Sequence, residues 1–258
     1  MDMIQEILLR LPPSTPATRV QAIQLVVWNP LSGEVRSIPS PGHRLGYSNA
    51  AVICSRGCDH RACSSTPFLV AFVRVDKDYV HVYACIFSSI TREWSARTLT
   101  DSDREDYFND EEPAAIAGDA VVFSGKDSLL VYHMVDRHLW VIELPPMIES
   151  NGFEQIRLLP SEDGELRYAC LFKNTLRLFS RDAVAAAWEQ TAVIKLHELL
   201  PFSITSPAYL GGFSDIITNC LFLRGSDGTI FSLSLTNFCT NRVGRTRAQI
   251  FFPYYSFV

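Results

Sequence analysis

The sequence has no hydrophobic run long enough to cross a bilayer and little clustered positive charge. No apolar stretch approaches the ~20 residues of a membrane-spanning helix, and acidic residues stand where a secretory signal would be basic. The formal net charge is -5, and basic residues gather only at Arg242, Arg245 and Arg247. This balance is unlike that of nucleic-acid-binding proteins. We therefore expect neither nucleic acid nor membrane as a partner.

Catalytic signatures are also missing. There is no Gly-x-Ser-x-Gly elbow, and His197-Glu198 lacks the second histidine of a zinc-protease motif. The glycines around Gly118 and Gly125 have the wrong spacing for a phosphate loop. The seven cysteines are an odd number, which indicates mostly reduced, buried thiols in the cytoplasm or nucleus. The sequence predicts no enzyme and no cofactor.

Short β-type runs repeat along most of the chain. Hydrophobic residues make up 47% and charged residues 20%, with a mean hydropathy of +0.08, so a sizeable core is expected. A strand, a polar turn and a second strand that often carries Trp recur, with turn centres near residues 31, 90, 137, 184 and 237. The five predicted hairpins cover residues 25–38, 82–95, 129–142, 176–196 and 229–243. Three further segments, 115–123, 166–172 and 216–223, would supply the other strands of their blades.

The spacing of the hairpins predicts the fold class. Propeller blades repeat every ~40–50 residues, close to the spacing seen here. We predict a mainly β, kelch-like β-propeller of about four or five blades, incomplete at its first blade. A β-sandwich with strands of similar length is the alternative. The recurrence of Trp within the repeats favours the propeller.

The first residues predict an amphipathic helix. Four apolar side chains share one face of it: Ile4, Ile7, Leu8 and Leu11. Pro12 and Pro13 end the helix because proline has no amide hydrogen and clashes with the preceding turn. A helix of about three turns is marginal alone. It must therefore pack on its own domain or on a partner.

Several segments carry a resemblance to one protein family. Residues 2–13 resemble the start of the F-box of plant, grass-type F-box proteins, and Leu25–Gly33 resembles the strand–turn of F-box-associated propellers. Residues 57–73, 158–164 and 253–257 resemble further stretches of the same family, in the same order. The resemblance implies a partial F-box, first helix only, over residues 1–20 and an F-box-associated β-propeller over 24–258.

The resemblance also implies a function. Members of this family are non-catalytic substrate-recognition subunits of Skp–cullin–F-box ubiquitin ligases, in which propeller loops hold a target protein. The residues that would contact the Skp-type adaptor, and through it a cullin, are Ile4, Ile7, Leu8, Leu11, Pro12 and Pro13. The F-box pattern stops after the beginning of a second helix at 16–20. The alternative is therefore a stand-alone interaction module, or a degenerate F-box paralogue that no longer binds the adaptor.

The recognition surface would consist of loops, because loops carry binding residues on rigid scaffolds. The predicted loops are 42–49, 100–113, 145–155 and 201–208. The segment 101–112 contains seven carboxylates. A solvated loop is the favoured interpretation, and a calcium site or a site for a basic partner is the alternative. We also predict that residues 249–257 pair with the strand at 24–28 to close the ring.

Two further sites were weighed. Four potential zinc ligands fall within ten residues: Cys54, Cys58, His60 and Cys63. Structural zinc sites usually pair two separated knuckles, and Cys54 is expected in a strand, so a surface loop is favoured over a metal site. A propeller hydrolase would need carboxylates converging on the axis. We expect the candidates to lie in separate turns: Asp119, Asp163, Asp215 and Asp227.

Overall fold

The computed structural model describes about three fifths of the chain, most of it β-strand. The described residues are 24–28, 33–41, 46–54, 67–76, 81–101, 114–125, 128–144, 155–159, 161, 164–181, 187–200, 209–213 and 219–246. The partial F-box predicted over 1–20, its helix, and the predicted closing segment 249–257 lie outside them. In the part of the chain that is described, no helix is long and apolar enough to span a membrane.

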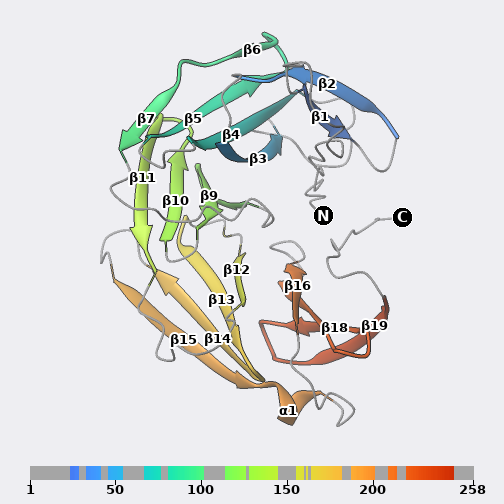
Figure 1. The fold of residues 1–258 in the computed structure, drawn as a ribbon. Coiled ribbons are helices and arrows are strands. Elements are labelled where there is room, and N and C mark those ends of the chain that lie inside the picture. Colours follow the sequence, from blue (N-terminus) through green and yellow to red (C-terminus); the bar gives the residue numbers. More distant parts are fainter. Residues whose placement is uncertain are drawn as a thin grey trace. The chain divides into compact units, whose positions relative to one another are not determined.

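The strands form sheets in chain order, each from consecutive strands (Figure 1). A hairpin comes first, β1 (Gln24–Trp28) with β2 (Val35–Pro39). A five-stranded sheet follows, with β3 (Gly46–Cys54), β4 (Phe68–Asp76), β5 (His81–Ser88), β6 (Glu93–Trp94) and β7 (Thr98–Asp101). The next sheet has β8 (Ala115–Ala117), β9 (Ala120–Ser124), β10 (Ser128–His133) and β11 (His138–Glu143).

The last two sheets repeat the four-stranded pattern. The first of them has β12 (Gln155–Leu159), β13 (Leu166–Phe172), β14 (Thr175–Arg181) and β15 (Trp188–Lys195). The one-turn helix α1 (Leu196–Leu199) follows β15. The final sheet has β16 (Tyr209–Phe213), β17 (Cys220–Arg224), β18 (Thr229–Ser234) and β19 (Thr240–Arg245).

This succession of antiparallel meanders is a β-propeller, with four blades of four or five strands besides the β1–β2 hairpin. The prediction of fold class is confirmed. A sandwich of Greek-key type would instead place strands from distant parts of the chain side by side in one sheet. Each sheet here contains only sequence neighbours.

The five predicted hairpins are all present, but some predicted boundaries are wrong. The segment 216–223 was expected to supply the further strands of its blade; β17 begins at Cys220 within it, but the inner strand of that blade, β16, lies before it. Residues 46–49 were expected in a recognition loop, 42–49. They instead extend β3, since Gly46–Asn49 pair in register with Val73–Asp76 of β4. Leu196, expected in a strand, begins α1.

Three outer hairpins share one turn geometry. The residue that ends each turn has a positive φ: 59° at Arg92, 53° at Arg137 and 57° at Phe238. In two of them the same backbone bond closes the turn, from Arg92 N to the Ser88 carbonyl (2.8 Å) and from Phe238 N to the Ser234 carbonyl (2.9 Å). None of the three is Gly or Asn, the residues that normally signal this conformation.

Two compact units divide the chain, residues 1–114 with 123–142 and residues 115–122 with 143–258. In the first unit, Leu25, Val27 and Ile38 of the β1–β2 hairpin share a buried cluster with Val70, Phe72 and Phe87 of the adjoining sheet. In the second unit, a larger cluster joins the sheets β12–β15 and β16–β19, with Leu171, Leu176, Leu221 and Leu233 almost completely buried. Side chains buried on both faces of a blade explain why its strands read as continuous apolar runs.

Candidate functional site

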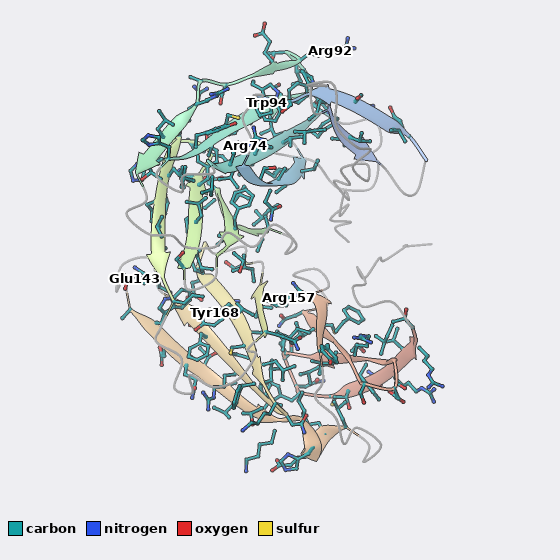
Figure 2. The ribbon with its side chains drawn as sticks, in the orientation of Figure 1. Arg74, Arg92, Trp94, Glu143, Arg157 and Tyr168 are labelled. Carbon is teal, nitrogen blue, oxygen red and sulfur yellow. The ribbon has the colours of Figure 1, made fainter. Side chains whose placement is uncertain are left out.

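Trp94 and Arg97 attach the β1–β2 hairpin to the neighbouring sheet within the first unit. The Trp94 ring lies 5.8 Å from Phe72, edge-on, and 5.4 Å from Phe87. Its indole Nε1 donates a hydrogen bond of 2.7 Å to the Pro39 carbonyl at the end of β2 (Figure 2). Arg97 donates from Nη2 to the Pro41 carbonyl at 2.5 Å. Trp94 ends β6 and Arg97 lies in the break between β6 and β7, so this irregular outer edge attaches the hairpin to the sheet.

Trp188 makes the equivalent contact within the second unit. Its ring is edge-on to Tyr168 at 5.0 Å, and Tyr168 stacks on Phe179 at 4.7 Å. Its Nε1 donates a hydrogen bond of 2.8 Å to the Glu143 carbonyl at the end of β11 (Figure 2). Trp94 and Trp188 therefore pack aromatic side chains of their own sheets and bind the end of the preceding outer strand.

Side chains of β12 bind the backbone of β16. The Gln155 Oε1 accepts from Leu210 N at 2.7 Å, and Arg157 Nη2 donates to the Leu210 carbonyl at 3.2 Å. The backbone N–H and carbonyl of Leu210 on β16 are thus each held by a side chain of β12, and the two side chains are two residues apart; Arg157 is labelled in Figure 2. Sequence reasoning missed this contact, because isolated Gln and Arg residues in a strand carry no signal for their partner.

The candidate catalytic carboxylates lie in separate turns where they are described. Asp119 is in the β8–β9 turn and Asp227 in the β17–β18 turn, whereas Asp163 and Asp215 lie outside the described residues. Asp227 accepts hydrogen bonds from Thr229, at 2.7 Å from Oγ1 and 2.9 Å from the backbone N. These bonds to Thr229 lower the pKa of Asp227 below its ordinary value. This carboxylate stabilises a turn.

The buried thiol of Cys85 and the buried phenol of Tyr132 are poor reagents. Burial raises the pKa of the Cys85 thiol to about 12, against a smaller opposing effect of Arg97. A thiol with that pKa is protonated and unreactive at neutral pH. Burial also raises the pKa of Tyr132, although the nearby Thr98 hydroxyl opposes it. No group of three His, Cys, Asp or Glu side chains that could hold a metal occurs among the described residues.

Most of the predicted site residues cannot be placed. Cys54 ends β3, as expected, but Cys58, His60 and Cys63 lie outside the described residues. The same holds for the six predicted adaptor-contacting residues and for most of the four predicted recognition loops. The described strands and turns therefore define the scaffold, and the predicted binding surface remains a prediction.

Comparison with known proteins supports the fold alone. No family model matches the chain, and no curated protein is similar to it in sequence. TolB from Acinetobacter baumannii is structurally similar, with a TM-score of 0.52 and 12% identity over 93% of this chain and 52% of TolB. An oligogalacturonate lyase in complex with manganese has a TM-score of 0.47 and 12% identity, covering 88% of this chain and 60% of the lyase.

A chain of a mitotic checkpoint complex gives a TM-score of 0.46 and 14% identity, covering 87% of this chain and 59% of the other. The chain thus spans between 52% and 60% of the length of these three structures. At 12% identity the similarity to TolB shows a shared fold and no shared activity. The propeller fold fits a protein-interaction module.

Proposed function

We propose that this chain is the non-catalytic substrate-recognition subunit of a Skp–cullin–F-box ubiquitin ligase. In this role the apolar face of residues 4–13 docks on a Skp-type adaptor, and propeller loops hold the target protein. The adaptor and its cullin supply the ubiquitin-transfer machinery. No residue of this chain takes part in the transfer.

The observation that carries the proposal is the series of blades with rigid cores. Propellers present loops from a scaffold whose strands barely rearrange, which suits recognition of a protein surface. The order of the segments adds support, since an F-box-like start precedes a β1–β2 hairpin whose sequence, Leu25–Gly33, resembles an F-box-associated propeller. Asp227 accepts hydrogen bonds within its own turn, and Cys85 is a buried, protonated thiol.

Co-purification with a plant Skp adaptor tests the proposal. The intact chain is compared with a version lacking residues 1–13, and circular dichroism checks that both are folded β proteins. Capture of the intact chain alone is the expected result. If neither version is captured while both remain folded and monomeric, the chain is a stand-alone propeller module and the ligase role is wrong.

A further inference from the structure

Trp140 differs from the two tryptophans that occupy comparable outer strands. Trp94 and Trp188 each donate the indole N–H to a backbone carbonyl of the preceding outer strand. Trp140 lies on β11, the outermost strand of its sheet, and is only partly buried. Among the described residues its Nε1 has no acceptor, and its ring contact is the exposed His138 imidazole, stacked at 5.2 Å with 27° between planes. The Trp140 indole is therefore available to a ligand.

The same hairpin carries further groups that a protein partner could use. Val135 in the turn is 60% exposed and Val141 on β11 is 40% exposed. Arg137 is exposed, and its guanidinium has no carboxylate partner among the described residues. The adjacent carboxylate, Asp136, instead lies 3.0 Å from His133 Nδ1. The β10–β11 hairpin thus combines a partly exposed aromatic ring and apolar side chains with a cation that no described carboxylate pairs.

The hairpin is also held in place at its turn. Thr98 Oγ1 donates to the Arg137 carbonyl at 3.0 Å, just before β11 begins. One edge of β11 pairs with β10, and no described strand pairs with the other. A strand held in this way, with an edge that no described strand covers, can accept an extended peptide at little ordering cost.

We propose that the β10–β11 hairpin, residues 133–143, is a docking site for an extended, carboxylate-bearing segment of a partner protein. An apolar side chain of that segment packs on Trp140, a main-chain carbonyl accepts from the indole N–H, and a carboxylate faces Arg137. Strand geometry supports this spacing, because three residues along a strand span about 10 Å, the reach of a short extended peptide. The proposal rests on the proposed function only in that the chain binds proteins. It does not require the adaptor.

Peptide selection on the full chain tests the site. A phage library of random dodecapeptides is selected on the immobilised protein, and the enriched peptides are synthesised with a fluorescent label. Their affinities are then measured by fluorescence polarisation for the wild type and for W140A, W140F and R137Q. The matched control is V193A, because Val193 is a 52%-exposed apolar residue on β15, the outermost strand of a different sheet.

We expect enriched peptides to contain acidic and apolar residues and to lose at least about tenfold in affinity with W140A, as for a central aromatic contact. W140F, which keeps a ring but removes the N–H, should show an intermediate loss, and R137Q should reduce the salt dependence of binding. V193A should bind like the wild type. Failure to enrich any peptide overturns the proposal, as does unchanged binding by a folded W140A or W140F variant.

This outcome is separable from that of the adaptor experiment. Peptide binding that depends on Trp140, together with no adaptor capture, supports the docking site and refutes the ligase role. Adaptor capture without Trp140-dependent peptide binding supports the ligase role and refutes the docking site.

Discussion

Gly228 gives the sharpest test of the described packing in the second unit. Its φ is +83°, and a Cβ at this position would lie 2.2 Å from the Thr246 carbonyl oxygen. The neighbouring backbone bond from Thr246 N to the Gly228 carbonyl, 2.8 Å, holds the end of β19 against the β17–β18 turn. In Gly228→Ala the left-handed backbone costs about 1–2 kcal/mol. Loss of the displaced hydrogen bond adds about 1 kcal/mol.

We therefore expect Gly228→Ala to lower the free energy of unfolding by about 2–3 kcal/mol. Two glycines of the same unit separate the cost of the left-handed backbone from the cost of the lost hydrogen bond. Gly164 has a φ of +82° with nothing within 4 Å of its Cβ position, so Gly164→Ala should cost only the backbone term, about 1–2 kcal/mol. Gly244 has open space and no positive φ, so Gly244→Ala should change stability by less than about 0.5 kcal/mol.

Urea unfolding followed by circular dichroism measures all three variants. Equal losses for Gly228→Ala and Gly164→Ala would show that the Thr246 carbonyl does not lie against Gly228, and the described end of β19 would be wrong. If Gly244→Ala lowered the free energy of unfolding as much as Gly164→Ala, the left-handed backbone at Gly164 could not explain the loss of stability there.

Three further predictions concern groups with assigned roles. Trp94→Phe and Trp188→Phe keep an aromatic ring but remove the indole donor, so each should lower the free energy of unfolding by about 1 kcal/mol. The two losses should add in the double variant, because the residues lie in separate units. A double variant whose loss in urea unfolding differs strongly from the sum would contradict this. Under native conditions Cys239, which is exposed, should react with a thiol reagent, whereas Cys85, buried with a pKa of about 12, should react only after unfolding. Mass spectrometry of the labelled peptides shows which cysteine has reacted. Labelling of Cys85 in the native protein would refute its burial. Because the pKa of Asp227 is lower in the folded chain than its ordinary 3.8, its carboxylate stabilises the fold above pH 3.8. This contribution is lost as the pH falls through the pKa of the folded chain. The difference in unfolding free energy between wild type and Asp227→Asn should therefore vanish in acid, and a difference that grows in acid would contradict the turn-stabilising role of Asp227.

The repeated hairpins could be predicted because each combines apolar runs with polar turns at a regular spacing. β18 illustrates this, since Thr229–Ser234 alternates buried and partly buried residues between turns rich in Gly, Asp and Asn. Inner strands were harder to find. β16, Tyr209–Phe213, contains two glycines and a register shift beside Leu210, so its sequence has neither strong alternation nor a continuous apolar run.

The contacts between sheets could not be predicted, because they join backbone groups to side chains far away in the chain. Trp94 packs against Phe72 and Phe87. Nothing in the sequence specifies Pro39 as the acceptor of its N–H, 55 residues away. The same limit applies to Gln155 and Arg157, whose shared partner Leu210 is identified only by the packing of β12 beside β16.

The most direct test of the central claim is the affinity of the purified chain for a purified Skp adaptor, measured by biolayer interferometry with the variant Ile7→Glu beside the wild type. Glu6→Gln is the matched control, because the predicted helix places Glu6 away from its apolar face. The account predicts saturable binding by the wild type and by Glu6→Gln, and a loss of at least about tenfold in Ile7→Glu, as expected when a charge replaces a buried apolar contact. A folded wild-type chain that does not bind the adaptor, or an Ile7→Glu variant that binds as tightly as the wild type, would contradict the account.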